Sequence, residues 1–125
     1  MKAGKEHRVP LSRQAAALLM QMQEFTSHDA ASFVFPGAKP GASLSNMAML
    51  STLKRMGRSD LTTHGFRSSF RDWAGQETHH PREVIEHALA HQLKDKAEAA
   101  YARGDLLKKR RVLMEDWSAF ASPAE

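Results

Sequence analysis

The chain has 125 residues, 42% apolar and 26% charged, so it can form one domain at most, or a piece of one. It contains no cysteine, which excludes disulfides and thiolate metal sites and favours a reducing, cytoplasmic compartment. No apolar run approaches the length of a membrane-spanning helix, and the polar N-terminus is not a signal peptide, so we expect no membrane partner.

The formal net charge is +4, and the basic excess is concentrated near the C-terminus. Residues 101–111 contain five basic side chains and one acid, Asp105. The basic residues are Arg103, Lys108, Lys109, Arg110 and Arg111. Such a run suits a polyanion such as DNA, and it is equally typical of a solvated helix face. Both interpretations stay open from charge alone.

The spacing of apolar residues predicts a mainly α fold with a remnant of a small β-sheet at the N-terminus. Residues 7–11 read as a short strand after a turn at Gly4. A strand needs a partner, so either another chain supplies it or the N-terminal part of the domain is missing, and we favour the second reading.

Helices account for most of the remaining sequence. Ser12 is expected to cap a helix that runs to about Thr26. The loop 27–43 contains an apolar triplet, Phe33-Val34-Phe35, which we expect to fill the core. Further helices are expected to start at Ser43 or Ser45 and end before Gly57, then to cover 64–75, 81–91, 95–102 and 105–121.

His64 and Arg67 lie three residues apart at the start of the helix predicted for 64–75, so their side chains project to one face. Helix N-termini attract anions, and an arginine fork matches two phosphate oxygens. The pair therefore makes a candidate phosphate cradle. The alternative is a capping histidine beside an arginine in a surface ion pair.

Two further motifs carry possible chemistry. His87 and His91 are four residues apart, a spacing that can bind zinc, but no acidic third ligand is evident. Tyr101, the single tyrosine, lies in an alanine-rich stretch typical of a packing residue. A phenol with a pKa of about 10 is a poor nucleophile unless cations or a base assist it. Arg67, His64 and His91 are the groups that could do so.

Taken in order, these motifs resemble the catalytic domain of tyrosine recombinases, most closely the P4-like prophage integrases. The resemblance runs from Lys2 to about Phe120, so residues 1–125 correspond to the C-terminal part of that domain. Residues 2–12 look like the family's β-hairpin, and 63–74 look like its His-x-x-Arg helix. Residues 86–91 match the next motif, with Ala90 where many relatives carry glycine.

The resemblance implies site-specific recombination of double-stranded DNA without metal or ATP. Tyr101 would attack the scissile phosphate and form a 3′-phosphotyrosyl bond. Arg67 would stabilise the transition-state charge, and His64 would manage the tyrosine proton. His91 would hydrogen-bond the phosphate, and Lys2 would protonate the leaving 5′-oxygen.

Further expectations concern contacts to DNA and the parts of the catalytic machinery that this fragment contains. Candidate contacts to the DNA backbone are Lys54, Arg55, Arg58 and Arg71. We expect self-association on DNA. The family's first catalytic arginine and its N-terminal DNA-binding domains belong upstream of Lys2, so we expect this fragment alone to be a poor recombinase or none.

Two rival functions remain. The main one is a non-catalytic helical DNA-binding remnant of a prophage integrase, which keeps the basic surface without the chemistry. A weaker one is a metallohydrolase that uses His64, His87 and His91.

Overall fold

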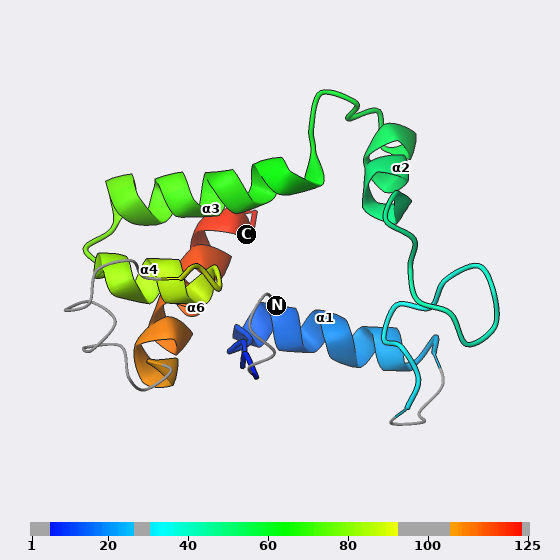
Figure 1. The fold of residues 1–125 in the computed structure, drawn as a ribbon, viewed down its shortest axis with the longest axis horizontal. Coiled ribbons are helices and arrows are strands. Elements are labelled where there is room, and N and C mark those ends of the chain that lie inside the picture. Colours follow the sequence, from blue (N-terminus) through cyan, green and yellow to red (C-terminus); the bar gives the residue numbers. More distant parts are fainter. Residues whose placement is uncertain (1–5, 27–30, 93–105, 124–125) are drawn as a thin grey trace. The chain divides into compact units, whose positions relative to one another are not determined.

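A computed structural model describes residues 6–26, 31–92 and 106–123 of the chain. Five helices lie in these ranges, which confirms the mainly α fold (Figure 1). The chain divides into two compact units, one formed by residues 14–66 and the other by residues 1–13 with 67–125. Within the described ranges, no helix is both long and apolar enough to cross a membrane.

The unit that contains residues 67–125 is built on three helices (Figure 1). Their buried side chains form one apolar core. α3 spans Thr63–Glu77, α4 spans Arg82–Ala88 and α6 spans Leu107–Ala121. The buried core residues are Phe70, Ala74, Val84, Ile85, Leu89 and Leu113. Burying one large apolar side chain stabilises a fold by about 1.5–3 kcal/mol, so this cluster holds the three helices together.

Aromatic side chains extend this core along α3 and α6. The rings of Trp73 and Trp117 have centroids 5.1 Å apart, and Phe70 meets Trp117 edge-on at 5.4 Å. Phe120 stacks on Trp73 at 5.5 Å. Such pairs add about 0.5–1.5 kcal/mol each beyond their buried area, so they fix how α6 lies against α3.

Residues 6–12 form no strand, which corrects the predicted β-sheet remnant at residues 7–11. Val9 and Leu11, the large apolar residues of this segment, are 57% and 46% exposed. The segment instead packs on helices of its own unit. Arg110 of α6 donates from Nη1 to the carbonyl oxygen of Arg8 at 2.5 Å, and the ring of His7 stacks on that of His87. The segment is held by side chains, without the backbone ladder that defines a strand.

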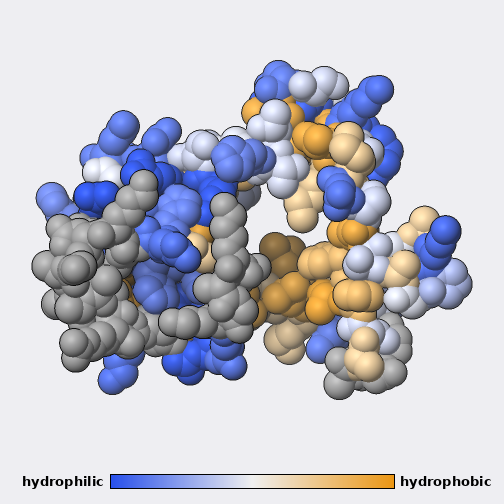
Figure 2. All heavy atoms as spheres, in the orientation of Figure 1, coloured by the Kyte–Doolittle hydropathy of each residue, from blue (hydrophilic) through white to orange (hydrophobic). Residues whose placement is uncertain are grey.

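The unit formed by residues 14–66 contains most of α1 (Arg13–Gln23), and α2 (Ala48–Arg55). None of its described residues is buried. Hydrophobic residues are correspondingly visible on its surface in Figure 2. The triplet Phe33-Val34-Phe35 is 47–50% exposed, so the expectation that it fills the core is wrong.

The loop after this triplet is closed by its own backbone. Pro36 and Ser43 form an isolated antiparallel bridge, and the Gly37 amide donates to the Ala42 carbonyl at 2.7 Å. A Cβ on Gly37 would lie 2.1 Å from the Ser43 carbonyl oxygen, so the turn requires glycine. Because the bridge takes up Ser43, the second helix starts later than predicted, at Ala48.

Most helix ends follow their local signals. Gly57 ends α2 with a left-handed φ of 73°, and the Arg58 amide donates to the Leu53 carbonyl at 2.8 Å, which confirms the predicted C-cap. Helices predicted at 12–26, 64–75, 81–91 and 105–121 correspond to α1, α3, α4 and α6. The helix predicted at 95–102 lies outside the described residues.

Candidate phosphate-binding site

The start of α3 presents His64 and Arg67. Thr62 caps the helix, because its Oγ1 accepts a hydrogen bond from the Gly65 amide at 3.0 Å. His64 lies in the first turn and Arg67 one turn further along, and both side chains are exposed. The local sequence therefore places a histidine and an arginine at exposed positions near the start of one helix.

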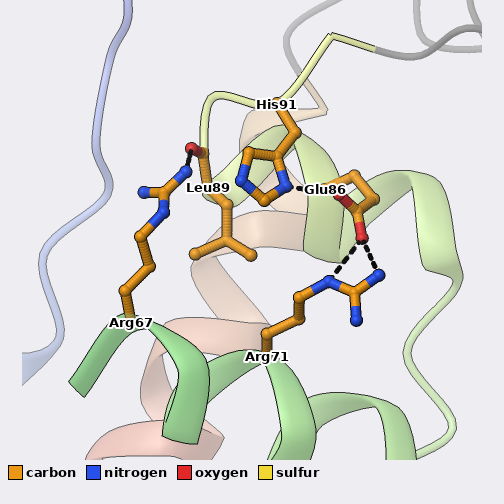
Figure 3. A network of polar contacts seen from close by, with 5 residues as sticks. All are labelled: Arg67, Arg71, Glu86, Leu89 and His91. Atoms are coloured by element: carbon orange, nitrogen blue, oxygen red, sulfur yellow. Dashed lines mark hydrogen bonds and ion pairs between the residues drawn. The ribbon is translucent and has the colours of Figure 1, made fainter. Parts of the chain in front are cut away.

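Arg67 reaches from α3 to the end of α4. Its Nη2 donates a hydrogen bond to the carbonyl oxygen of Leu89 (Figure 3). Leu89 is itself only 6% exposed and belongs to the core, so this carbonyl is a fixed acceptor. A guanidinium has five N–H donors, so this bond leaves Arg67 with donors for a further oxygen ligand.

His91 is placed by the way α4 ends. Ala90 adopts a left-handed φ of 55°. The Ala90 amide donates to the His87 carbonyl at 3.0 Å, and the His91 amide donates back to the Glu86 carbonyl at 2.9 Å. These two bonds define a Schellman motif, with Ala90 at C′ and His91 at C″. The motif folds His91 back over the last turn of α4.

Glu86 connects His91 to Arg71 of α3 (Figure 3). Its Oε2 lies 2.5 Å from His91 Nδ1, and its Oε1 lies 3.0 Å from both Nε and Nη2 of Arg71. Burial on its own raises the pKa of Glu86, but the hydrogen bond from His91 and the positive charges of Arg71 and His91 outweigh it. The pKa of Glu86 is therefore lowered, and the carboxylate is ionised at neutral pH.

The structure thus brings together Arg67 and His91, which the sequence singled out, at the end of α4 (Figure 3). Tyr101 and Lys2 lie outside the described residues. Sequence reasoning missed Glu86. The signal that could have revealed it is an acid that directly follows the buried pair Val84-Ile85.

The candidate DNA contacts differ in how much of their charge is available. Lys54 and Arg55 lie in the exposed last turn of α2. Arg58 is engaged by Asp60, with Nε–Oδ1 3.0 Å and Nη2–Oδ2 2.9 Å, and this hydrogen-bonded pairing lowers the pKa of Asp60. Arg71 is half exposed, but its charge is paired with Glu86.

The basic residues near the C-terminus also differ in their exposure to solvent. Arg110 is fully buried and bonded to the Arg8 carbonyl, whereas Lys108, Lys109 and Arg111 of α6 are exposed. Arg110 therefore contributes to packing. The two interpretations of the run, a DNA-binding surface and a solvated helix face, apply only to its exposed residues.

Two of the three histidines considered as metal ligands have other contacts, and so does His80. His87 stacks on His7 with ring centroids 5.9 Å apart, and His91 Nδ1 is engaged by Glu86. His80, in the loop before α4, lies 2.6 Å from Asp116 of α6. Over residues 6–26, 31–92 and 106–123, no three histidine or acidic side chains are arranged to hold a metal ion.

The chain is similar along nearly its whole length to integrases of prophages and phages. It is 36% identical over 127 residues to the prophage integrase IntA of Escherichia coli K12, covering all of this chain and 30% of that protein. The corresponding identity is 38% over 119 residues for IntZ of the same organism, covering 94% of this chain and 29% of the relative. The integrase of enterobacteria phage P4 is 32% identical over 125 residues, covering 96% of this chain and 28% of that integrase.

No protein-family model and no solved structure matches the chain. A mainly helical segment that matches integrases over 94–100% of its length is an integrase segment. The chain therefore belongs to the phage integrase family, and it corresponds to the C-terminal 30% or so of these relatives.

Proposed function

We propose that this chain is the C-terminal catalytic part of a site-specific DNA recombinase that uses Tyr101 as its nucleophile. The observation that carries the proposal is that Arg67 of α3 and His91, which follows α4, both lie at the C-terminal end of α4 (Figure 3). One supplies a guanidinium and the other an imidazole, the groups that a phosphoryl-transfer site uses for charge and hydrogen bonding.

In the proposed reaction the Tyr101 hydroxyl attacks the phosphorus and passes its proton to His64. The bond from phosphorus to the 5′-oxygen breaks, and Lys2 protonates that oxygen. A 3′-phosphotyrosyl bond replaces the phosphodiester, so no external energy source is needed. Attack by the 5′-hydroxyl of another strand reverses the step and seals the exchanged strands.

Arg67 has the main electrostatic task in this scheme. Its donors that are not bonded to Leu89 would hold the non-bridging oxygens, where charge develops in the transition state. His91 would donate a further hydrogen bond to the same phosphate. We infer that Lys54 and Arg55 contact the DNA backbone, because they are exposed at the end of α2.

The test must supply what the resemblance places upstream of Lys2, including the first catalytic arginine. A suitable protein is a chimera in which this 125-residue chain replaces the matching C-terminal segment of the phage P4 integrase. It is incubated with a nicked suicide substrate for that integrase, which traps the covalent intermediate. We expect a protein–DNA adduct with the chimera and none with its Tyr101→Phe variant.

Arg67→Ala should lower the rate of adduct formation by about 10³–10⁵, the range attached to an essential arginine in phosphoryl transfer. Arg13→Ala removes the same charge from an exposed position at the start of α1 and should change the rate little. We expect the isolated chain to bind DNA but to form adduct slowly or not at all. A chimera that binds the substrate without adduct would instead support the non-catalytic DNA-binding remnant.

A further inference from the structure

We propose that Glu86 is a positioning residue of this site, whose carboxylate determines which ring nitrogen of His91 faces the DNA phosphate. The inference rests on the proposed function, since it gives Glu86 a task in phosphate recognition by His91. Glu86 itself would not touch DNA.

Both carboxylate oxygens of Glu86 are already occupied. Oε2 pairs with His91 Nδ1 at 2.5 Å, and Oε1 accepts from Arg71 at 3.0 Å (Figure 3). Only 11% of the Glu86 side chain is exposed. A buried carboxylate is tolerated only when it is paired in this way, and the two partners of Glu86 engage both of its oxygens. Its contacts point to the orientation of neighbouring groups.

The end of α4 gives this contact its geometry. In a Schellman motif the side chains at C″ and C3 commonly touch through apolar groups. Here C″ is His91 and C3 is Glu86, and a polar contact between the side chains takes the place of the apolar one. His91 is therefore attached to Glu86 twice, through the backbone at 2.9 Å and through the ring at 2.5 Å.

Attachment at Nδ1 decides the chemistry of the other nitrogen. Because the carboxylate of Glu86 is ionised, Nδ1 carries the proton and donates. Nε2 lies on the opposite side of the ring, so it is the nitrogen left for a phosphate oxygen, to which it donates when the ring is protonated. A partner on one ring nitrogen fixes the tautomer and orientation of a histidine in the same way at metal sites.

A purely structural role of Glu86 would have different consequences when the residue is replaced. In that case the pair of Glu86 and Arg71 would only link α4 to α3, and its loss would lower stability without changing the proton position on His91. The location of that proton therefore separates the two roles, and it can be measured without DNA.

The first measurement uses ¹⁵N spectra of the histidine rings in the 125-residue chain, recorded over a series of pH values so that the neutral form of the His91 ring is observed. The chain has seven histidines, so His91→Gln identifies the signals of interest. We expect His91 to be protonated at Nδ1 in the natural chain and to shift toward Nε2 protonation in Glu86→Ala. Glu83→Ala, on the same helix, should leave the ring unchanged. An Nδ1 proton that persists in Glu86→Ala overturns the inference.

Glu86→Gln is a second variant that keeps the test decisive if Glu86→Ala fails to fold. Its amide is neutral but similar in size, so we expect partial loss of the Nδ1 proton. Near-ultraviolet circular dichroism from the contact of Trp73 with Trp117 reports whether the core is intact in each variant. A folded Glu86→Gln variant with ring signals identical to the natural chain counts against the inference.

The second measurement is adduct formation by the chimera. Glu86→Ala should slow it about 10–100-fold, by analogy with the loss seen when an orienting partner of a metal-binding histidine is removed. Glu83→Ala should match the unsubstituted chimera. An unchanged rate in Glu86→Ala overturns the role in cleavage. If the unsubstituted chimera forms no adduct, the proposed function fails, whereas the ring spectra still decide whether Glu86 orients His91.

Discussion

Ala90 has a strained backbone conformation at the point where α4 turns toward the candidate site. Its φ of 55° lies in the left-handed region, which costs a residue with a Cβ roughly 1–2 kcal/mol. Glycine adopts this region freely, and the tyrosine-recombinase resemblance places glycine here in many relatives. The Schellman bonds of Ala90 and His91 nevertheless hold the turn in place.

Ala90→Gly should therefore raise the free energy of unfolding by about 0.5–1 kcal/mol, since relief of strain exceeds the added entropy of the unfolded chain. Urea unfolding followed by circular dichroism measures the change. Ala119→Gly, at an exposed position inside α6, is the matched control and should lower it by about 1 kcal/mol. Equal destabilisation by both substitutions would contradict the strain at Ala90.

Glu86 also makes stability depend on pH. Its pKa is lowered in the folded state, so the folded protein binds a proton at this site less readily than the unfolded chain. The resulting stabilisation is complete above the unfolded pKa of about 4.3 and is lost as pH falls through the lower folded value.

In urea unfolding between pH 7 and pH 3, the stability difference between the natural chain and Glu86→Gln should therefore shrink below about pH 4.3. Glu83→Gln provides the control for removal of an acid from the same helix. A stability difference for Glu86→Gln that stays constant across this range would show that the partners of Glu86 do not lower its pKa.

At the scale of elements, the end of α2 and the loop after it present cations in two electrostatic states. Lys54 and Arg55 lie on the exposed last turn, whereas Asp60 neutralises Arg58. Each phosphate that a basic side chain neutralises contributes about 0.9 to the slope of log K against log salt. Lys54→Ala should thus weaken binding to a DNA duplex and reduce this slope by about 0.9, while Arg58→Ala should do so less.

Fluorescence anisotropy between 50 and 200 mM salt measures both effects. Asp60→Asn should strengthen binding, because it frees the charge of Arg58. Lys39→Ala, in the exposed loop before α2, serves as the control. Equal effects of Lys54→Ala and Arg58→Ala would contradict a difference set by ion pairing.

The elements also show what a sequence can reveal. Helices were predictable because their signals are local: the Thr62 cap and the left-handed Gly57 act within a few residues. The structure of residues 7–11 was not predictable in this way, because a strand forms only with a partner strand, which the local sequence pattern cannot identify. Arg110 was misread as part of a basic surface, since its burial depends on contact with Arg8, distant in sequence.

The same distinction applies to the candidate site. Arg67 and His91 were identified from motif order. Glu86 begins the motif at residues 86–91 but was given no role, because its importance comes from Arg71 on another helix and from the turn at Ala90. A motif reveals residues that recur at fixed spacing, whereas an orienting contact appears only when helices pack.

At the scale of the whole molecule, buried side chains are distributed unevenly. All the buried apolar residues of the described core lie between Phe70 and Leu113, and no described residue of 14–66 is buried. Local stability follows burial and contact density, so the helices should open with different free energies. Amide hydrogen exchange should therefore show strong protection in α4, α6 and the later part of α3, and weak protection in α2.

Leu113→Ala tests whether this protection depends on the shared core. Leu113 is fully buried, so its truncation should cost about 2–5 kcal/mol and lower protection in α3, α4 and α6 together. Exchange in α2 should hardly change, because its side chains do not belong to that cluster. Met49→Ala removes a side chain that is 57% exposed on α2 and should leave the three core helices unaffected. If α2 lost protection in parallel with α4 in Leu113→Ala, the two units would unfold as one, and the separate stability inferred from burial would be wrong.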